Sequence, residues 1–163
     1  TLRDAEDPSR ADTHERRVLA GYWPEFLCGL VCAGANHPQP DRDNGLLTGD
    51  EVSALDLSRC DLVVLSACET ALGKRQAGEG MLSLTRSFRV AGARTVISSL
   101  WQVRDDSTKD LMLDFYDRLW NKGESKLDAL RGAQTDMLRK NREKYGDTRP
   151  ATWGAFVLTG EAE

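Results

Sequence analysis

Two short apolar runs decide the fold: residues 61–67 read DLVVLSA, and residues 95–101 read TVISSLW. The first is continuously apolar over 62–65, which is typical of a strand buried on both faces of a parallel sheet. Between the runs, residues 81–91 carry apolar side chains at helical spacing and stop before Gly92, which predicts a helix. A strand, a helix and a second strand in this order predict a parallel pair with the helix across one face.

The same reading extends outward to the rest of the chain. Asp105 or Asp106 is expected to cap a helix, and Ser125 with Asp128 to open another. We therefore expect an α/β fold with a mostly parallel sheet. The remaining elements are predicted as a strand over 27–35, a short helix over 48–55 opened by Thr48 and Glu51, a loop over 68–80, a helix from about 105 to 120, a helix over 126–144 and a last strand over 153–158.

Composition limits the class of protein. The chain of 163 residues fits one domain, with a polar loop or tail over 1–26 and the domain proper over 27–163. Its 22 Lys and Arg face 26 Asp and Glu, which argues against a nucleic-acid partner. It contains no apolar run of the roughly 18 residues that a membrane span needs, so we expect no membrane partner. The low cysteine content predicts a reducing, cytoplasmic location.

Cys28 and Cys32 stand four residues apart, and His37 follows them. These residues could begin a metal site, but no second Cys or His pair completes a zinc set. The alternative is that both cysteines are small residues in a packed segment. We expect neither a metal nor a cofactor.

Cys68 follows the first buried strand directly and opens a loop that contains glycines. In parallel sheets, the active crevice lies at the carboxyl ends of the strands, so this position suits a nucleophile. By position alone, Cys68 could equally be a small core residue.

Several motifs resemble the CHAT family, the bacterial caspase-like peptidase domains that are often joined to TPR repeats. The resemblance covers about residues 27–160, with the motifs in the order of that family. They are CGLVCAGAN at 28–36, GLLTGDEVSALDL at 45–57, LVVLSACET at 62–70, GEG at 78–80, AGAR at 91–94, SSLWQVRDDST at 99–108 and WGAFVLTG at 153–160.

The resemblance implies a caspase-like three-layer sandwich, with helices on both faces of the sheet, and a Cys/His dyad that cleaves a protein substrate. Cys68 matches the nucleophile. Ser99, Leu100 and Trp101 match the strand end that pairs with the substrate and lines its pocket. Asp105 would add a negative charge that favours a basic P1 residue. Two alternatives stay open: Asp105 as a helix cap only, and Trp101 as a core residue.

The chain departs from the family at the catalytic base, which the family places in an apolar-Thr-His-Gly setting. The two histidines here are His14, in the polar segment ADTHERR, and His37, in a proline-rich loop. Because the chain begins with Thr1, we expect it to start after the histidine strand and to lack the first strands of the fold. The strand over 61–67 would then need an upstream segment or a neighbouring protomer beside it.

Three functions follow as hypotheses. The first is the C-terminal part of a cysteine endopeptidase whose histidine lies outside this chain, in a parent protein that carries a TPR or other sensor domain. The second is a catalytically inactive CHAT-like module that binds a protein partner. The third is an unrelated small α/β binding domain, such as a flavodoxin-like one. It would need a glycine loop that binds phosphate, but GKRQAGEG at 73–80 lacks the order of a P-loop.

Overall fold

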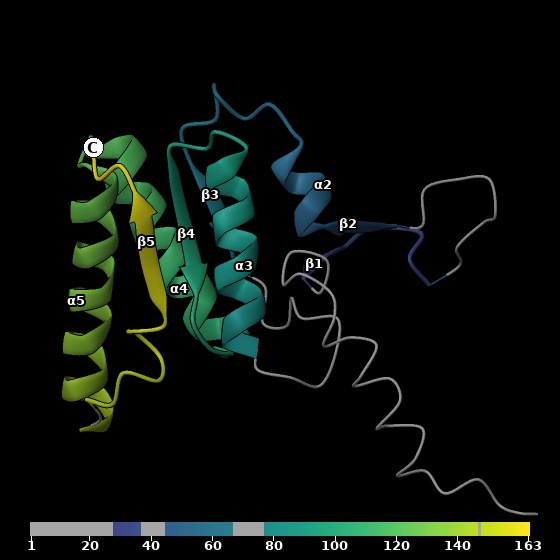
Figure 1. The fold of residues 1–163 in the computed structure, drawn as a ribbon. Helices are drawn as coiled ribbons and strands as arrows, with labels where there is room; N and C mark the ends of the chain where they lie inside the picture. The colour runs from purple at the N-terminus through teal and green to yellow at the C-terminus, as the bar shows by residue number, and fades with distance from the viewer. Residues whose placement is uncertain (1–27, 37–44, 67–76, 147) are drawn as a thin grey trace, which may run out of the picture.

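The computed structural model describes residues 28–36, 45–66, 77–146 and 148–163. Helices and strands alternate through most of these ranges, which confirms the α/β class (Figure 1). The elements are β1 (Gly29–Val31), β2 (Leu46–Thr48), α2 (Gly49–Ser53), β3 (Val63–Leu65), α3 (Ala77–Val90), β4 (Thr95–Ser99), α4 (Asp105–Tyr116), the π-helical turn η2 (Asp117–Asn121), α5 (Lys126–Tyr145) and β5 (Phe156–Gly160). The segment over 1–26, His14, His37 and Cys68 lie outside the described residues.

The central sheet has the order β3-β4-β5. β3 and β4 are parallel, with Val63 opposite Val96 and Leu65 opposite Ser98, as the sequence predicts. The strands β1 and β2 form a separate antiparallel pair.

The last strand differs from the expected parallel arrangement, because β5 runs antiparallel to β4 and makes the sheet mixed. The cause is the number of helices in the connection. A single helix returns the chain to the end of the sheet where the preceding strand began. Two helices that run in opposite directions, as α4 and α5 do, leave the chain at the end of the sheet where β4 finished (Figure 1). The next strand must then run back.

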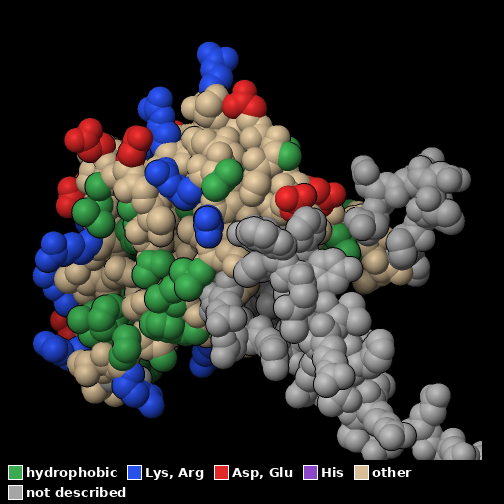
Figure 2. All heavy atoms as spheres, viewed as in Figure 1, with side chains coloured by type: hydrophobic (Ala, Val, Ile, Leu, Met, Phe, Trp, Pro, Cys, Tyr) green, Lys and Arg blue, Asp and Glu red, His purple; other side chains and the backbone are tan. Residues whose placement is uncertain are grey.

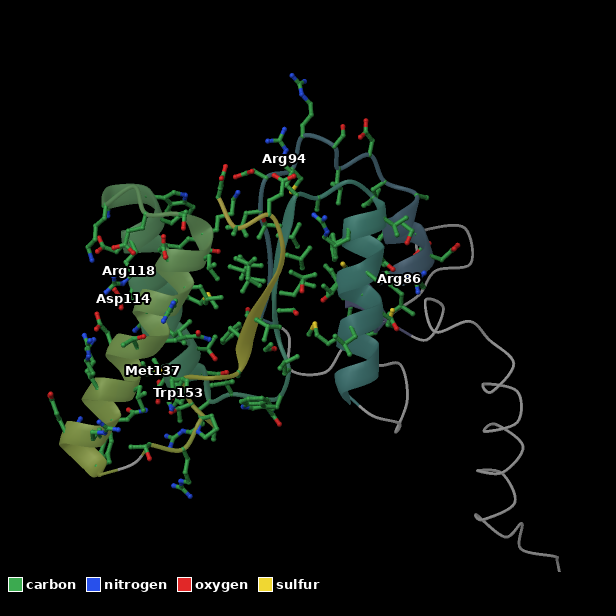
Figure 3. The ribbon with its side chains drawn as sticks, turned by 60° about the vertical axis from the view of Figure 1, so that its left-hand side comes forward. Arg86, Arg94, Asp114, Arg118, Met137 and Trp153 are labelled. Atoms are coloured by element: carbon green, nitrogen blue, oxygen red, sulfur yellow. The ribbon has the colours of Figure 1, made fainter. Side chains whose placement is uncertain are left out.

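Helices cover both faces of this sheet, and its side chains feed two cores (Figure 3). Val96 faces α3 and α2 in a cluster that includes Leu65, Leu84 and Val52. Ile97 faces α4 and α5 in the other cluster. Because alternate residues of β4 enter different cores, the whole strand is buried.

The helix starts follow local capping chemistry. Thr48 and Glu51 form the predicted capping box of α2, and the side chain of Ser125 accepts a hydrogen bond from the Asp128 N–H at the start of α5. The prediction for α4 was wrong, since its N-cap is Arg104, which makes no side-chain cap. Asp105 and its neighbour instead occupy the first turn, where a negative charge favours the helix dipole.

Several predicted boundaries were also wrong, among them that of the strand expected over 27–35, which spans only Gly29–Val31. Helix α3 begins at Ala77, so the loop expected over 68–80 does not extend that far. Strand β4 ends at Ser99, two residues before the predicted end at Trp101. Strand β5 begins at Phe156, because Gly154 donates its N–H to the Pro150 carbonyl at 2.8 Å and closes a turn there.

Within the described ranges, no helix is both long and apolar enough to cross a bilayer.

Candidate active site

Because β3 and β4 are parallel, their carboxyl ends lie side by side at the same end of the sheet. Leu65 lies opposite Ser98, and Cys68 comes three residues after Leu65 in the sequence. The described strand ends therefore converge where the sequence predicts the site, although the thiol lies outside the described residues. Hydrophobic side chains gather in the lower part of Figure 2, toward the end of the molecule where β4 ends.

The predicted substrate-binding residues have two different environments. Ser99 is buried in β4, so its hydroxyl is not on the surface. Leu100 and Trp101 are 37% and 38% exposed, which makes Trp101 a surface residue and not a core residue. Of the three predicted substrate-binding residues, Leu100 and Trp101 therefore supply the exposed apolar surface at this end of the sheet.

The loop before β5 is bound to these two residues. The Leu100 N–H donates to the Ala155 carbonyl at 2.8 Å. The Trp101 indole Nε1–H donates to the Ala151 carbonyl at 3.1 Å. Both bonds join segments about fifty residues apart in the sequence. The loop before β5 therefore lies against Leu100 and Trp101 and forms one wall of the candidate site.

Helix α5 holds the same loop from its other side. Asn141 Nδ2 donates to Thr152 Oγ1 in the loop, and Gln134 Nε2 donates to the Phe156 carbonyl at the start of β5, both at 2.8 Å. Trp153 lies at the opposite end of the sheet from Arg94 (Figure 3). Sequence reasoning missed this wall, because it assigned residues 153–155 to the last strand and not to the site.

Asp105 is solvent-exposed in the first turn of α4. The side chain of Val103, between Trp101 and Asp105, is buried.

Several groups with clearly shifted pKa values lie in the helices and at their caps. The backbone hydrogen bond from Thr48 holds the pKa of Glu51 below its ordinary value. The Asn121 amide, followed by Lys122, lowers the pKa of Asp117, and burial raises the pKa of Tyr116. In the described part of the chain, no group of His, Cys, Asp and Glu side chains is arranged to hold a metal ion.

Comparison with known proteins gives a consistent picture. The family model of the CHAT domain matches residues 26–161. Tetratricopeptide repeat protein 28 of Mus musculus is 34% identical over 115 residues, which are 71% of this chain. The protein of the same name from Homo sapiens is 33% identical over 115 residues. The chain spans about 4% of the length of these curated relatives.

Proposed function

This chain belongs to the CHAT domain family, and on that premise we propose that it forms the C-terminal part of a cysteine endopeptidase. Cys68 is the nucleophile in this proposal, and a histidine outside these 163 residues is the base. The observation that carries the proposal is the SACET motif at 66–70, which follows β3 within the family match. We assign residues 27–163 to the domain.

The proposed reaction is acyl transfer to sulfur followed by hydrolysis. The Cys68 thiolate attacks the scissile carbonyl carbon, and the histidine passes the thiol proton to the leaving amine as the C–N bond breaks. Water then attacks the thioester, releases the carboxylic acid and returns the proton to sulfur. This sequence needs no metal or cofactor.

Substrate recognition in this proposal uses the wall beside β4. Leu100 and Trp101 offer exposed apolar surface for the substrate. The loop before β5 lies next to them, because the carbonyl groups of Ala151 and Ala155 accept hydrogen bonds from these two residues. Asp105 adds a carboxylate open to solvent, which favours a basic P1 side chain by charge pairing.

The proposed setting is a cytoplasmic parent protein in which a TPR or other sensor domain controls the peptidase. The printed name of the relatives, tetratricopeptide repeat protein 28, supports the TPR partner. The free thiols of Cys32 and Cys60 support a reducing compartment.

Covalent labelling tests the peptidase directly. We would treat the longest natural polypeptide that contains this chain with a peptidyl chloromethyl ketone bearing arginine at P1, and locate the adduct by peptide mass spectrometry. We expect labelling at Cys68 that Cys68→Ala abolishes. Asp105→Asn should weaken the preference for arginine over norleucine by roughly tenfold, the effect of losing one charged contact.

A second candidate function is an inactive CHAT-like module that binds a protein partner. It is favoured by the two histidines of the chain, since neither His14 nor His37 stands in the apolar-Thr-His-Gly setting. If the chloromethyl ketone leaves Cys68 unmodified in the longer polypeptide, the peptidase proposal is wrong and this second function replaces it.

A further inference from the structure

Positive charge is concentrated in one segment of this otherwise acidic chain. The whole chain carries 22 Lys and Arg against 26 Asp and Glu, whereas residues 139–149, RKNREKYGDTR, contain five Lys or Arg and two Asp or Glu. Figure 2 shows Lys and Arg side chains over the lower end of α5. Four of these five cations belong to the last two turns of that helix, and we call them the basic end of α5: Arg139, Lys140, Arg142 and Lys144.

Three members of the basic end have no acidic partner in the described part of the chain. Arg139 pairs with Asp136 of the same helix at 3.1 Å. Lys140, Arg142 and Lys144 are exposed, and none of the described carboxylates forms an ion pair with them. The helix dipole favours the two cations of the last turn, Arg142 and Lys144. Because Lys140 precedes that turn, the dipole does not account for the whole cluster.

The basic end lies beside the wall of the candidate site. Asn141, in the middle of the basic end, donates a hydrogen bond to Thr152 of the loop before β5. The residue before Thr152 is Ala151, whose carbonyl accepts a hydrogen bond from the Trp101 indole. Consecutive Cα atoms are about 3.8 Å apart. Only the width of this loop therefore separates α5 from Trp101.

An exposed aromatic ring adds apolar surface on the side of α5 that faces the loop. Lys144 and Tyr145 follow Asn141 by three and four residues, so all three share this side of the helix. The Tyr145 ring is 67% exposed, and the Lys144 ammonium lies 5.1 Å from the ring centroid. A ligand on this side of α5 therefore meets cations and an aromatic face together.

This combination of charge and apolar surface indicates the kind of partner. Cations without acidic partners attract carboxylates, and an exposed tyrosine beside them favours a ligand that also carries apolar side chains. A polypeptide segment with several Asp or Glu supplies both. A nucleic acid fits less well, because the chain outside residues 139–149 carries 17 Lys and Arg against 24 Asp and Glu and would repel a long polyanion.

We propose that the basic end of α5, together with Tyr145, is a docking surface for an acidic segment of a protein partner. The Asp and Glu side chains of that segment pair with the basic end, and an apolar side chain between them rests on Tyr145. The surface includes neither Cys68 nor a catalytic base. Docking of the acidic segment therefore does not depend on whether the chain cleaves its partner.

The test uses the 163-residue chain and a short fluorescent peptide in which glutamate alternates with serine around one central leucine. The same peptide with glutamine in place of glutamate is the control. Fluorescence anisotropy measures both affinities at low ionic strength and again with added sodium chloride. We expect the glutamate peptide to bind and salt to weaken it, because salt screens exposed charge pairs. The glutamine peptide should not bind.

A triple variant connects binding to the basic end. Lys140→Gln, Arg142→Gln and Lys144→Gln together should weaken binding of the glutamate peptide by roughly tenfold, the effect of losing several exposed charge pairs. The affinity that remains should also depend less on sodium chloride, because fewer charge pairs are left to screen.

A second triple variant is the matched control, since it removes the same charge elsewhere. It combines three substitutions at exposed positions: Arg59→Gln, Arg86→Gln and Arg94→Gln. Arg86 belongs to α3, on the other face of the sheet from α5, and Arg94 is at the opposite end of the sheet from Trp153 (Figure 3). This variant should bind the glutamate peptide almost as the unmodified chain does. Circular dichroism establishes that both variants keep the native fold.

Three results would overturn the proposal. The glutamate peptide could fail to bind, or bind no more tightly than the glutamine peptide, and charge would then have no role. The two triple variants could weaken binding equally, which would assign the effect to net charge and not to the basic end. A single-stranded oligonucleotide of the same net charge could bind more tightly than the glutamate peptide, and the surface would then be a nucleic-acid site.

Discussion

Gly92 shows how one residue joins two elements of this fold. It ends α3 with a φ of +106°, and a Cβ there would lie 2.9 Å from the Ser58 backbone nitrogen. Glycine is therefore required at this position both for its backbone conformation and for the close approach of the neighbouring loop. The sequence predicts the helix end at Gly92, but the contact with Ser58 depends on the tertiary fold.

Gly92→Ala is expected to destabilise the chain by about 2 kcal/mol or more, since strain and overlap add. Gly123→Ala is the matched control, because its φ is +68° and no atom lies within 4 Å of the added Cβ. The control should lose only about 1 kcal/mol. Urea unfolding at constant pH compares the two, and equal losses would show that the Ser58 contact is unimportant.

Arg118 connects three segments of the helical layer. Its guanidinium pairs with Asp114 of α4 at 3.1 Å, with Glu124 at 3.1 Å and with Asp136 of α5 at 2.5 Å. Gly132 leaves room for it, because a Cβ there would lie 2.6 Å from Arg118 Nη1. The close approach of α5 to η2 therefore depends on a small residue facing a large cation.

Arg118→Met is expected to lower the free energy of unfolding by about 2 kcal/mol, because it removes the cation that three neighbouring carboxylates share, although Asp136 keeps a second partner in Arg139. The control is Lys122→Met, which removes an exposed pair with Asp117 and should leave the free energy of unfolding almost unchanged. Urea midpoints measure both changes. If the two variants lose the same stability, the Arg118 cluster is no stronger than a surface pair.

At the scale of elements, the capping box makes α2 sensitive to pH. Hydrogen bonds from Thr48 hold the folded-state pKa of Glu51 below its ordinary value of 4.5. A depressed carboxyl pKa adds stability above the unfolded pKa, and that stability is lost as the pH falls through the folded pKa. Protonation of Glu51 therefore weakens the start of α2.

Comparison of the unmodified chain with Glu51→Gln isolates this effect from the other carboxyl groups. The stability advantage of glutamate should be largest above pH 4.5 and should shrink as the pH falls below that value. Urea unfolding at a series of pH values gives the difference. An advantage that stays constant with pH would contradict the assignment.

How far the sequence predicts each element depends on where its determinants lie. Local signals were sufficient for the cap of α2, the start of α5 and the parallel pair of β3 and β4. The direction of β5 and the start of that strand depend on how α5 packs and where the Pro150 turn closes. Leu100 and Trp101 were predicted from a sequence motif, whereas the loop before β5 that is hydrogen-bonded to them could be recognised only in the folded structure.

At the scale of the whole molecule, the reactivity of Cys68 should depend on polypeptide outside this chain. Without a cationic partner, its thiol should titrate near the ordinary pKa of about 8.5. We expect iodoacetamide to alkylate Cys68 in the 163-residue chain with that profile, read by peptide mass spectrometry. Cys28, which is buried, and Cys32, which is exposed, serve as internal references of low and high accessibility. An apparent pKa well below 8.5 would mean that this chain supplies a cationic partner, and substitution of His14 and His37 in turn would test whether either one is that partner.

The loop before β5 has a consequence for tolerance to insertions. The loop is hydrogen-bonded to Trp101 and Leu100 on one side and to Asn141 on the other. Because these bonds hold it at both sides, they restrict the number of residues that it can contain. Added residues there would move the wall of the candidate site, and relatives that differ in this connection should differ in substrate preference. The turn at Gly123, with open space around it, can accept added residues without that effect.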